Sequence, residues 1–201
     1  KNLGHYRVNQ IQKKWNPLEY RRINDFKVGI LGLGALGSVL AKDLVRFGFR
    51  VQGWSNSKKN LSGIQTFAGT QQLSDFLETA EILVCLLPLT DDTTGILNAE
   101  LFSRLPKGAY IINVARGGHV VDTDLIQYID SGHLSGACLD VFHQEPLPPD
   151  HPYWAHDKIH MTPHCASVSD TDSVIPQILE NFRRLQNGEP LMNLVSTERG
   201  Y

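Results

Sequence analysis

The chain has 201 residues, of which 41% are hydrophobic and 20% are charged, and its formal net charge at pH 7 is −2. This balance is typical of a globular protein with a sizeable core, and it gives no electrostatic reason to expect nucleic acid or an anionic membrane as a partner. The most apolar run, residues 82–89, contains Pro88 and is far shorter than the roughly 20 residues that span a bilayer. We therefore expect small molecules or further copies of the chain as partners.

The N-terminal residues lack the apolar core of a secretory signal, and the sequence begins with Lys1 instead of Met. We expect a fragment of a cytoplasmic protein. The cysteines are odd in number and share no metal-ligand spacing, which favours reduced thiols at Cys85, Cys138 and Cys165. No metal site is expected.

The first elements can be placed by composition and periodicity. Residues 1–22 are basic and aromatic with Asn16-Pro17 in the middle, which predicts the end of a helix followed by a linker. Residues 27–31 predict a buried strand, and the apolar spacing of residues 35–47 predicts a helix packed on a sheet. A strand thus meets a helix through a Gly-rich turn.

The rest of the chain alternates strand and helix patterns. Apolar runs predict strands at residues 49–54, 82–87, 109–115, 136–141 and 159–162. Helices are expected at residues 73–79, 92–98 and 122–129. This alternation predicts an α/β fold with a Rossmann-type doubly wound parallel sheet and helices on both faces. A last amphipathic helix is predicted over residues 169–185, with Asn187-Gly188 as its stop.

The Gly-rich turn between the first strand and its helix has the spacing GxGxxG. Gly32 permits the tight turn, Gly34 lets the backbone approach a pyrophosphate, and Gly37 allows close packing of helix on strand. The helix N-terminus then offers unpaired N–H groups to the phosphates. The turn, including Ala35 and Leu36, is predicted to bind a dinucleotide, the alternative being a glycine turn that only packs well.

The end of the second strand bears on the choice of cofactor. An NAD enzyme normally offers an acidic residue to the ribose there, whereas this chain has Ser55, Asn56, Ser57, Lys58 and Lys59. Hydroxyl, amide and ammonium groups suit a 2′-phosphate, which a carboxylate would repel. The sequence therefore favours NADP(H), with NAD(H) possible, and the alternative is an ordinary solvated turn.

Three later segments each end a predicted strand, where doubly wound sheets bind ligands. They are Asn-Val-Ala-Arg-Gly-Gly at 113–118, Leu-Asp-Val-Phe-His-Gln-Glu-Pro at 139–146 and Thr-Pro-His-Cys-Ala at 162–166. Together they supply a guanidinium, two carboxylates and an imidazole. The Gly-rich turn and these three motifs follow one another along the chain in the order found in the D-isomer-specific 2-hydroxyacid dehydrogenases, and the sequence resembles that family.

Reduction of a 2-keto acid explains these residue types. Arg116 suits the substrate carboxylate because its planar fork binds carboxylates through two hydrogen bonds. His164 is predicted to donate a proton to the carbonyl oxygen, and Glu145 to fix and charge its ring. The resemblance implies that Asp140 contacts the nicotinamide carboxamide. Each residue also has a structural alternative when it is considered alone. Arg116 would be a surface arginine, Glu145 half of a salt bridge, and His164 a polar cap on a turn.

Further cofactor contacts are predicted along the same edge of the sheet. They are Leu87, Pro88, Thr94, Val114 and Ala115, together with Arg116, Asp140 and His164. The other histidines of the second half of the chain are expected at the surface or behind the site: His119, His133, His143, His151, His156 and His160.

Within the family, residues 53–59, 152–156 and 199–201 resemble the bacterial reductases of glyoxylate and hydroxypyruvate. The resemblance implies NADPH as reductant and a homodimer, although Asn56 stands where members often carry Arg. Family members carry a substrate domain before the dinucleotide domain. We expect residues 1–22 to be its remnant and linker, 23–166 the Rossmann domain, and 167–201 a helix and tail that return to the substrate domain. The chain alone is then expected to bind cofactor without catalysing a reaction.

Two other functions share this fold. One is an NAD(P)H-sensing binding protein like the C-terminal-binding corepressors, which the motifs alone do not separate from a reductase. The other is a hydrolase that holds NAD, such as adenosylhomocysteinase, and the set of Arg116, Glu145 and His164 argues against it.

Overall fold

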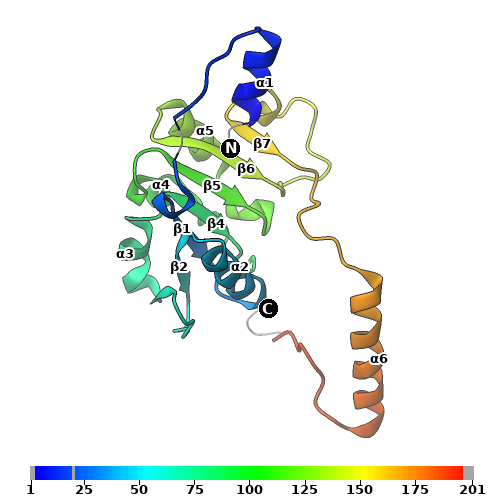
Figure 1. Cartoon of the computed structure of the whole chain (residues 1–201). Helices are drawn as coiled ribbons and strands as arrows, with labels where there is room; N and C mark the ends of the chain where they lie inside the picture. Colours follow the sequence, from blue (N-terminus) through cyan, green and yellow to red (C-terminus); the bar gives the residue numbers. More distant parts are fainter. Residues whose placement is uncertain (1–2, 20, 197–201) are drawn as a thin grey trace.

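A computed structural model describes residues 3–19 and 21–196 of the chain (Figure 1). Its centre is one sheet of seven strands in the order β3-β2-β1-β4-β5-β6-β7, and every neighbouring pair is parallel. The strands are β1 (Lys27–Leu31), β2 (Arg50–Ser55), β3 (Gln65–Ala68), β4 (Ile82–Cys85), β5 (Ala109–Asn113), β6 (Leu134–Leu139) and β7 (Ile159–Met161). This is the Rossmann-type α/β fold that the sequence predicts.

The described residues form six α-helices: α1 (Leu3–Ile11), α2 (Ala35–Arg46), α3 (Leu73–Leu77), α4 (Ala99–Arg104), α5 (Asp122–Asp130) and α6 (Thr171–Asn187). Of these, α2 covers one face of the sheet, and α3, α4 and α5 cover the other. One apolar cluster joins the sheet to α2, and a larger one joins it to α3, α4 and α5. On β1, Val28 and Ile30 belong to the first cluster and Leu31 to the second, because successive side chains of a strand point to opposite faces.

All six predicted strands are confirmed, and each end lies within two residues of its predicted position, but two other elements differ from expectation. The helix predicted at residues 92–98 is wrong. Residues 91–95 form turns in which the hydroxyls of Thr93 and Thr94 donate to the carbonyls of Pro88 and Thr90, at 2.6 and 2.8 Å. Such side-chain bonds compete with a helix, which instead begins after Asn98, whose Oδ1 accepts the Leu101 N–H. The edge strand β3 was not predicted at all.

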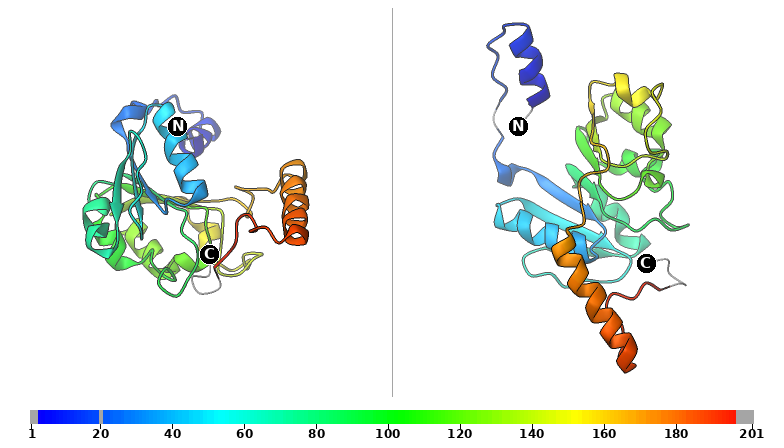
Figure 2. Two further views of the ribbon diagram at one scale, coloured as in Figure 1. Left: turned by 90° about the horizontal axis from the view of Figure 1, so that it is seen from below. Right: turned by 90° about the vertical axis from the view of Figure 1, so that its right-hand side faces the viewer.

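The last helix, α6, stands away from the rest of the molecule (Figures 1 and 2). It begins after Asp170, whose carboxylate accepts the N–H groups of Asp172 and Ser173, and it ends at Gly188 with a left-handed φ of 66°. The predicted stop at Asn187-Gly188 is therefore confirmed. Residues 197–201, the end of the predicted tail, lie outside the described residues.

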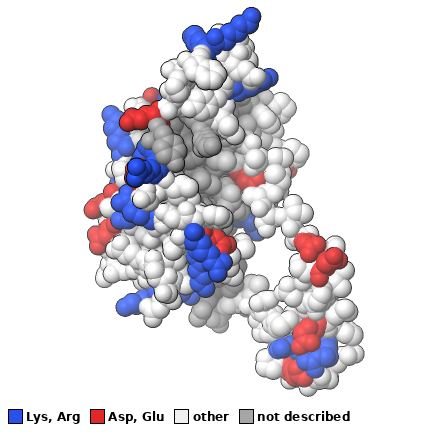
Figure 3. Space-filling view, in the orientation of Figure 1, with Lys and Arg blue, Asp and Glu red and all other residues white. Residues whose placement is uncertain are grey.

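Lys, Arg, Asp and Glu are scattered over the face shown in Figure 3, with a mixed cluster at the far end of α6. This cluster consists of Glu180, Arg183, Arg184 and Glu189, which form ion pairs of 2.7 to 2.9 Å. In the part of the chain that the structure describes, no helix is both long and apolar enough to cross a membrane.

Candidate active site

The turn from β1 to α2 gives each of its three glycines a different environment. Gly32 has a φ of +113°, which favours glycine, and its N–H donates to Trp54 O at 2.9 Å. A Cβ on Gly37 would overlap the Gly32 carbonyl oxygen, so the third glycine permits the contact of helix and turn. A Cβ on Gly34 would meet nothing within 4 Å. The first and third glycines are thus needed by the fold, whereas the second faces open space.

The N-terminus of α2 opens beside Gly34. No side chain caps this end of the helix, and Gly34, Ala35 and Leu36 are exposed. A helix N-terminus without a cap offers backbone N–H groups and a partial positive charge to an anion. The open space at Gly34 and the free end of the 12-residue helix fit the pyrophosphate of a dinucleotide.

In the turn after β2, the residues predicted to discriminate between NADP(H) and NAD(H) differ in exposure. Ser55 is buried, and its hydroxyl donates to Ser57 O at 2.8 Å, so this hydroxyl is occupied within the turn. Asn56, Ser57 and Lys58 are exposed. Any discrimination between a 2′-phosphate and a 2′-hydroxyl therefore falls mainly on the exposed side chains that follow Ser55.

The loop after β4 is organised by threonine hydroxyls. Thr93 Oγ1 donates to Pro88 O at 2.6 Å and accepts the Thr90 N–H at 2.8 Å. Leu87 is buried, while Thr94 is exposed. The hydrogen bonds fix the main chain of Pro88, which is one of the predicted cofactor contacts.

Arg116 follows β5 and is held through its main chain. Asn113, which is fully buried, accepts the Ala115 N–H at 3.1 Å and donates from Nδ2 to Arg116 O at 2.9 Å. The side chain of Arg116 is exposed, and its NH1 donates to Ala115 O at 2.7 Å. The buried amide fixes the turn and leaves the guanidinium at the surface. The sequence motif contains Asn113, but no role is predicted for it, although an amide that ends an apolar strand run is a signal for one.

The loops after β5 and β6 lie in direct contact. A Cβ on Gly117 would overlap the main chain of Phe142, so only glycine permits this approach. Phe142 in turn donates its N–H to Glu145 Oε1 at 2.9 Å. The turn that carries Arg116 is thereby packed on the segment that carries Glu145.

Asp140 is buried at the end of β6 and anchors the segment after β7. Its Oδ1 accepts the Thr162 hydroxyl at 2.5 Å and the Cys165 N–H at 2.9 Å, and its Oδ2 accepts the Ala166 N–H at 3.0 Å. Burial raises the pKa of Asp140, but these hydrogen bonds and the nearby His164 outweigh it, so the pKa lies below its usual range. The carboxylate stays charged and holds the segment on both sides of His164.

His164 and Glu145 form a close pair. Nδ1 of His164 lies 2.6 Å from Glu145 Oε2, although the two residues are 19 positions apart. The bond to His164 and the Phe142 N–H hold the pKa of Glu145 below its usual range. His164 has a φ of +51°, an uncommon conformation for a residue with a side chain. The imidazole is half exposed, so Nε2 remains available to a ligand.

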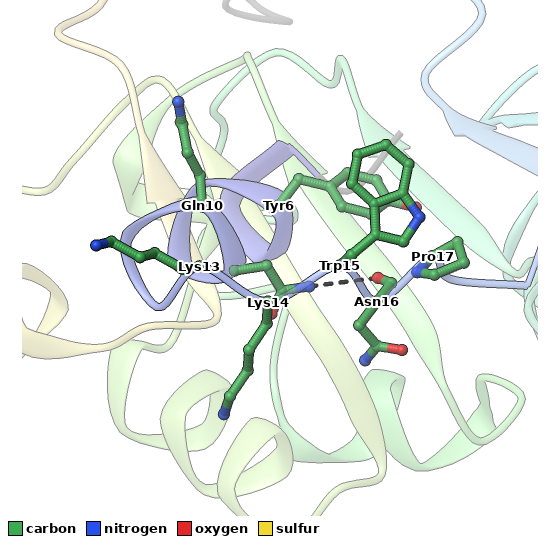
Figure 4. A pocket seen from close by; sticks show the side chains of 8 residues that line it. Tyr6, Gln10, Lys13, Lys14, Trp15, Asn16 and Pro17 are labelled. Carbon is green, nitrogen blue, oxygen red and sulfur yellow. Dashed lines mark hydrogen bonds between the residues drawn. The ribbon is translucent and has the colours of Figure 1, made fainter.

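A hollow of about 480 Å³ opens at this pair. Its lining combines the two polar groups with apolar side chains: Phe142, Glu145, Pro146, Leu147, Trp154, Met161, Thr162, Pro163 and His164. A second hollow, of about 600 Å³, is lined only by α1 and the segment after it (Figure 4). It contains Lys13, Lys14 and Trp15 and none of the predicted site residues.

Among the other histidines, His119 lies behind the site, which is one of the two expected places. It is fully buried, whereas His133, His151 and His156 are partly exposed and His143 and His160 are exposed. No group of three or more His, Cys, Asp or Glu side chains suited to a metal ion occurs in residues 3–19 and 21–196.

Residues 1–166 match the family described as "D-isomer specific 2-hydroxyacid dehydrogenase, NAD binding domain". The chain belongs to the D-isomer specific 2-hydroxyacid dehydrogenases. Membership agrees with the Gly-rich turn and with the order of the Arg116, Glu145 and His164 segments along one edge of the sheet.

Relatives of known name are similar over the whole chain. Glyoxylate/hydroxypyruvate reductase A of Serratia proteamaculans is 42% identical over 201 residues, and the chain spans 64% of that relative's length. A D-isomer specific 2-hydroxyacid dehydrogenase of Xanthobacter autotrophicus, solved with NADPH and MES, is 44% identical with a TM-score of 0.96, over all of this chain and 83% of that one. The NADPH-dependent glyoxylate/hydroxypyruvate reductase of Sinorhizobium meliloti, solved with NADP and sulfate, is 38% identical with a TM-score of 0.95, over 99% of this chain and 64% of that one.

Proposed function

We propose that the full-length protein reduces small 2-keto acids, such as glyoxylate and hydroxypyruvate, to 2-hydroxy acids. The observation that carries this proposal is the 2.6 Å pair of His164 and Glu145. The turn that carries Arg116 packs on the segment of Glu145, and both follow strands at the sheet end where the Gly-rich turn also lies. A charged imidazole, a guanidinium and a dinucleotide turn are what the reduction of a keto acid needs.

The cofactor proposed is NADPH, which supplies a hydride to the carbonyl carbon when bound. The space at Gly34 and the uncapped end of α2 would receive its pyrophosphate, and Asn56, Ser57 and Lys58 would surround the 2′-phosphate. Two relatives of high TM-score were solved with NADPH or NADP, which supports the choice.

Each residue of the site has a proposed task. Arg116 binds the substrate carboxylate with its exposed guanidinium. His164 donates the proton on Nε2 to the carbonyl oxygen, while Glu145 accepts the N–H of Nδ1 and stabilises the charged ring. Asp140 holds the His164 segment through three hydrogen bonds, and it orients the nicotinamide carboxamide.

We also propose the domain organisation and setting. Residues 1–22 would be a remnant of a substrate domain and linker, 23–166 the dinucleotide domain, and 167–201 a segment that returns to the substrate domain. The exposed apolar side chains of α6 support the last assignment. A cytoplasmic homodimer is proposed as the working form, supported by three free cysteines and by Trp15, which is 98% exposed.

The test is a titration of the chain with NADPH and then NADH, followed by nicotinamide fluorescence, and an assay of the full-length protein with glyoxylate and hydroxypyruvate. Tighter binding of NADPH and oxidation of NADPH only when a keto acid is present are expected. Binding without turnover of any 2-keto acid would favour a dinucleotide-sensing protein. No binding of either cofactor would refute the proposed function.

A further inference from the structure

We propose that His119 is a positioning residue that sets Arg116 relative to the loop after β4. The inference rests on the proposed function, because it assigns a task within that site. It starts from an unusual placement, since His119 is 0% exposed and is the only histidine that is fully buried among the described residues.

Both ring nitrogens of His119 contact main-chain groups of predicted site residues. Nδ1 lies 2.9 Å from Arg116 O and 3.3 Å from Arg116 N. Nε2 lies 3.2 Å from Pro88 O, which belongs to a loop 31 residues away in sequence. The neutral tautomer that serves both contacts carries its proton on Nε2, so Nδ1 accepts the Arg116 N–H.

The two contacts bridge loops that the sheet alone does not join. Pro88 follows β4, and Arg116 follows β5, whose strand ends at Asn113. The main chain supports the same junction, because the N–H of Gly95 donates to Gly118 O and the N–H of Leu97 donates to His119 O, both at 2.8 Å. The imidazole is the side chain of this junction that reaches Arg116 and Pro88 together.

An apolar side chain in this place would remove the acceptor of the Arg116 N–H and the second donor to Pro88 O. Pro88 O would keep the Thr93 hydroxyl, and Arg116 O would keep the Asn113 amide, so each loop would still be closed within itself. What would be lost is the side-chain link between Arg116 and Pro88, while the main-chain hydrogen bonds of Gly95 and Leu97 would remain. The expected consequence is a displaced guanidinium in a folded protein, and displacements of about 1 Å at a substrate-positioning group can cost about 10²-fold in rate.

Three substitutions separate the two halves of the bridge. His119→Asn keeps a polar group near the position of Nδ1, and so the contact with Arg116. His119→Gln can place its amide near the position of Nε2, and so keeps the contact with Pro88. His119→Leu keeps neither contact. A positioning role predicts losses that grow in the order Asn, Gln, Leu.

His133 provides a matched control. Its Nε2 also contacts a carbonyl oxygen 31 residues away, Phe102 O at 2.9 Å, but neither residue belongs to the predicted site. His133→Leu therefore removes a comparable long-range hydrogen bond. It should lower the melting temperature while leaving ligand affinities as they are in the wild type.

The experiment uses the full-length protein and measures the melting temperature, the Kd of NADPH, the Kd of oxamate for the NADPH-bound protein and the KM of glyoxylate. Oxamate is a carboxylate next to a carbonyl group, so it reports on Arg116 without being reduced. For His119→Leu we expect a rise of about tenfold or more in the Kd of oxamate and the KM of glyoxylate, for His119→Asn about threefold or less, and little change for NADPH.

An unchanged oxamate affinity in His119→Leu, or the same loss in His119→Asn as in His119→Leu, would overturn the inference alone. If His119→Leu does not fold, the comparison of His119→Asn with His119→Gln decides, and equal affinities in those two would overturn it. A wild-type protein that binds neither NADPH nor oxamate would overturn the proposed function and the inference together.

Discussion

Two regions of the molecule differ in the partners of their side chains. One consists of the loops after β5, β6 and β7, and the other is the helix α6. In the loops, Asn113, His119 and Asp140 are buried. Asn113 binds the main chain of its own turn, whereas His119 and Asp140 bind main-chain groups of neighbouring loops. On α6 no residue is buried, and Ile175, Ile178, Leu179, Phe182 and Leu185 are each more than half exposed. The hydrogen bonds and ion pairs of α6 run mainly to its own residues and to the segment that follows it.

The difference shows which part of the molecule finds its packing and hydrogen-bond partners within the described chain. The site edge of the sheet has its polar groups satisfied within the chain, and no buried side-chain nitrogen or oxygen in the described residues lacks a partner. The apolar side of α6 covers nothing in that part of the chain. An exposed apolar surface of this extent is uncommon on a monomeric globular protein. The same kind of substitution should therefore change the free energy of unfolding differently in the two regions.

The largest contrast is expected for truncation of leucine. Leu125 on α5 is 0% exposed, and Leu125→Ala should lower the free energy of unfolding of the 201-residue chain by about 2–5 kcal/mol. Leu179 on α6 is 62% exposed, and Leu179→Ala should change it by less than about 0.5 kcal/mol. Urea unfolding of both variants is the measurement. Equal losses would mean that α6 is packed in solution, which would end the comparison.

A substitution within the loops separates chemistry from packing. His164→Ala in the full-length protein should lower kcat by about 10² or more, since it removes the proposed proton donor. The control is His160→Ala, which removes an exposed imidazole on β7, the strand that precedes His164. It should leave kcat unchanged. Steady-state kinetics with glyoxylate and NADPH measure both. An unchanged kcat in His164→Ala would remove His164 from the mechanism.

The exposed turn after β2 tests the preference for cofactor. Asn56→Asp introduces a carboxylate beside the proposed 2′-phosphate and should lower the ratio of NADPH to NADH affinity about tenfold, a change of about 1.4 kcal/mol. Asn60→Asp places the same charge on another exposed residue nearby and should have less effect. Fluorescence titrations with both cofactors give the ratios. Equal shifts in the two variants would locate the phosphate elsewhere.

The smallest effect is expected from pH. The pKa of Asp140 is lowered in the folded chain, so the unfolded chain binds more protons in acid, and this part of the stability is present above the usual carboxyl pKa of about 4 and lost as pH falls. Asp140→Asn should cost about 1 kcal/mol near pH 7 through a lost acceptor, and the difference from wild type should narrow toward pH 3. Urea unfolding across this range measures it, with the exposed Asp150→Asn as control. A constant difference would contradict the charged state.

Sequence patterns predicted the fold well where local and tertiary preferences agree. The Gly-rich turn, most strands and the stop of α6 follow from apolar spacing and from glycine at positions of positive φ. The edge strand β3 has only partly buried side chains and a polar start at Gln65, so it lacks the apolar run that marks the central strands. Its pairing with β2 supplies the order that its sequence does not indicate.

For the candidate site, the motifs placed the expected residues on one edge of the sheet, and their roles stay predictions. The sequence could not show that His119 is buried, because the partner that makes burial tolerable, Pro88 O, lies in another loop. It also could not show that the Ser55 hydroxyl is turned toward Ser57 O. Both facts depend on how separate segments meet, which local pattern does not encode.

The position of β1 in the middle of the sheet also affects the order in which the strands pair during folding. Lys27 pairs with Arg50 and Val28 with Ile82, so the first strand of this sheet in chain order is the one on which both halves of the sheet grow. Every pairing waits for a crossover segment to be complete, which makes such a sheet slow to form. During synthesis, β1 to β3 can pair while the rest is still being made, and the other edge of β1 stays open until β4 emerges.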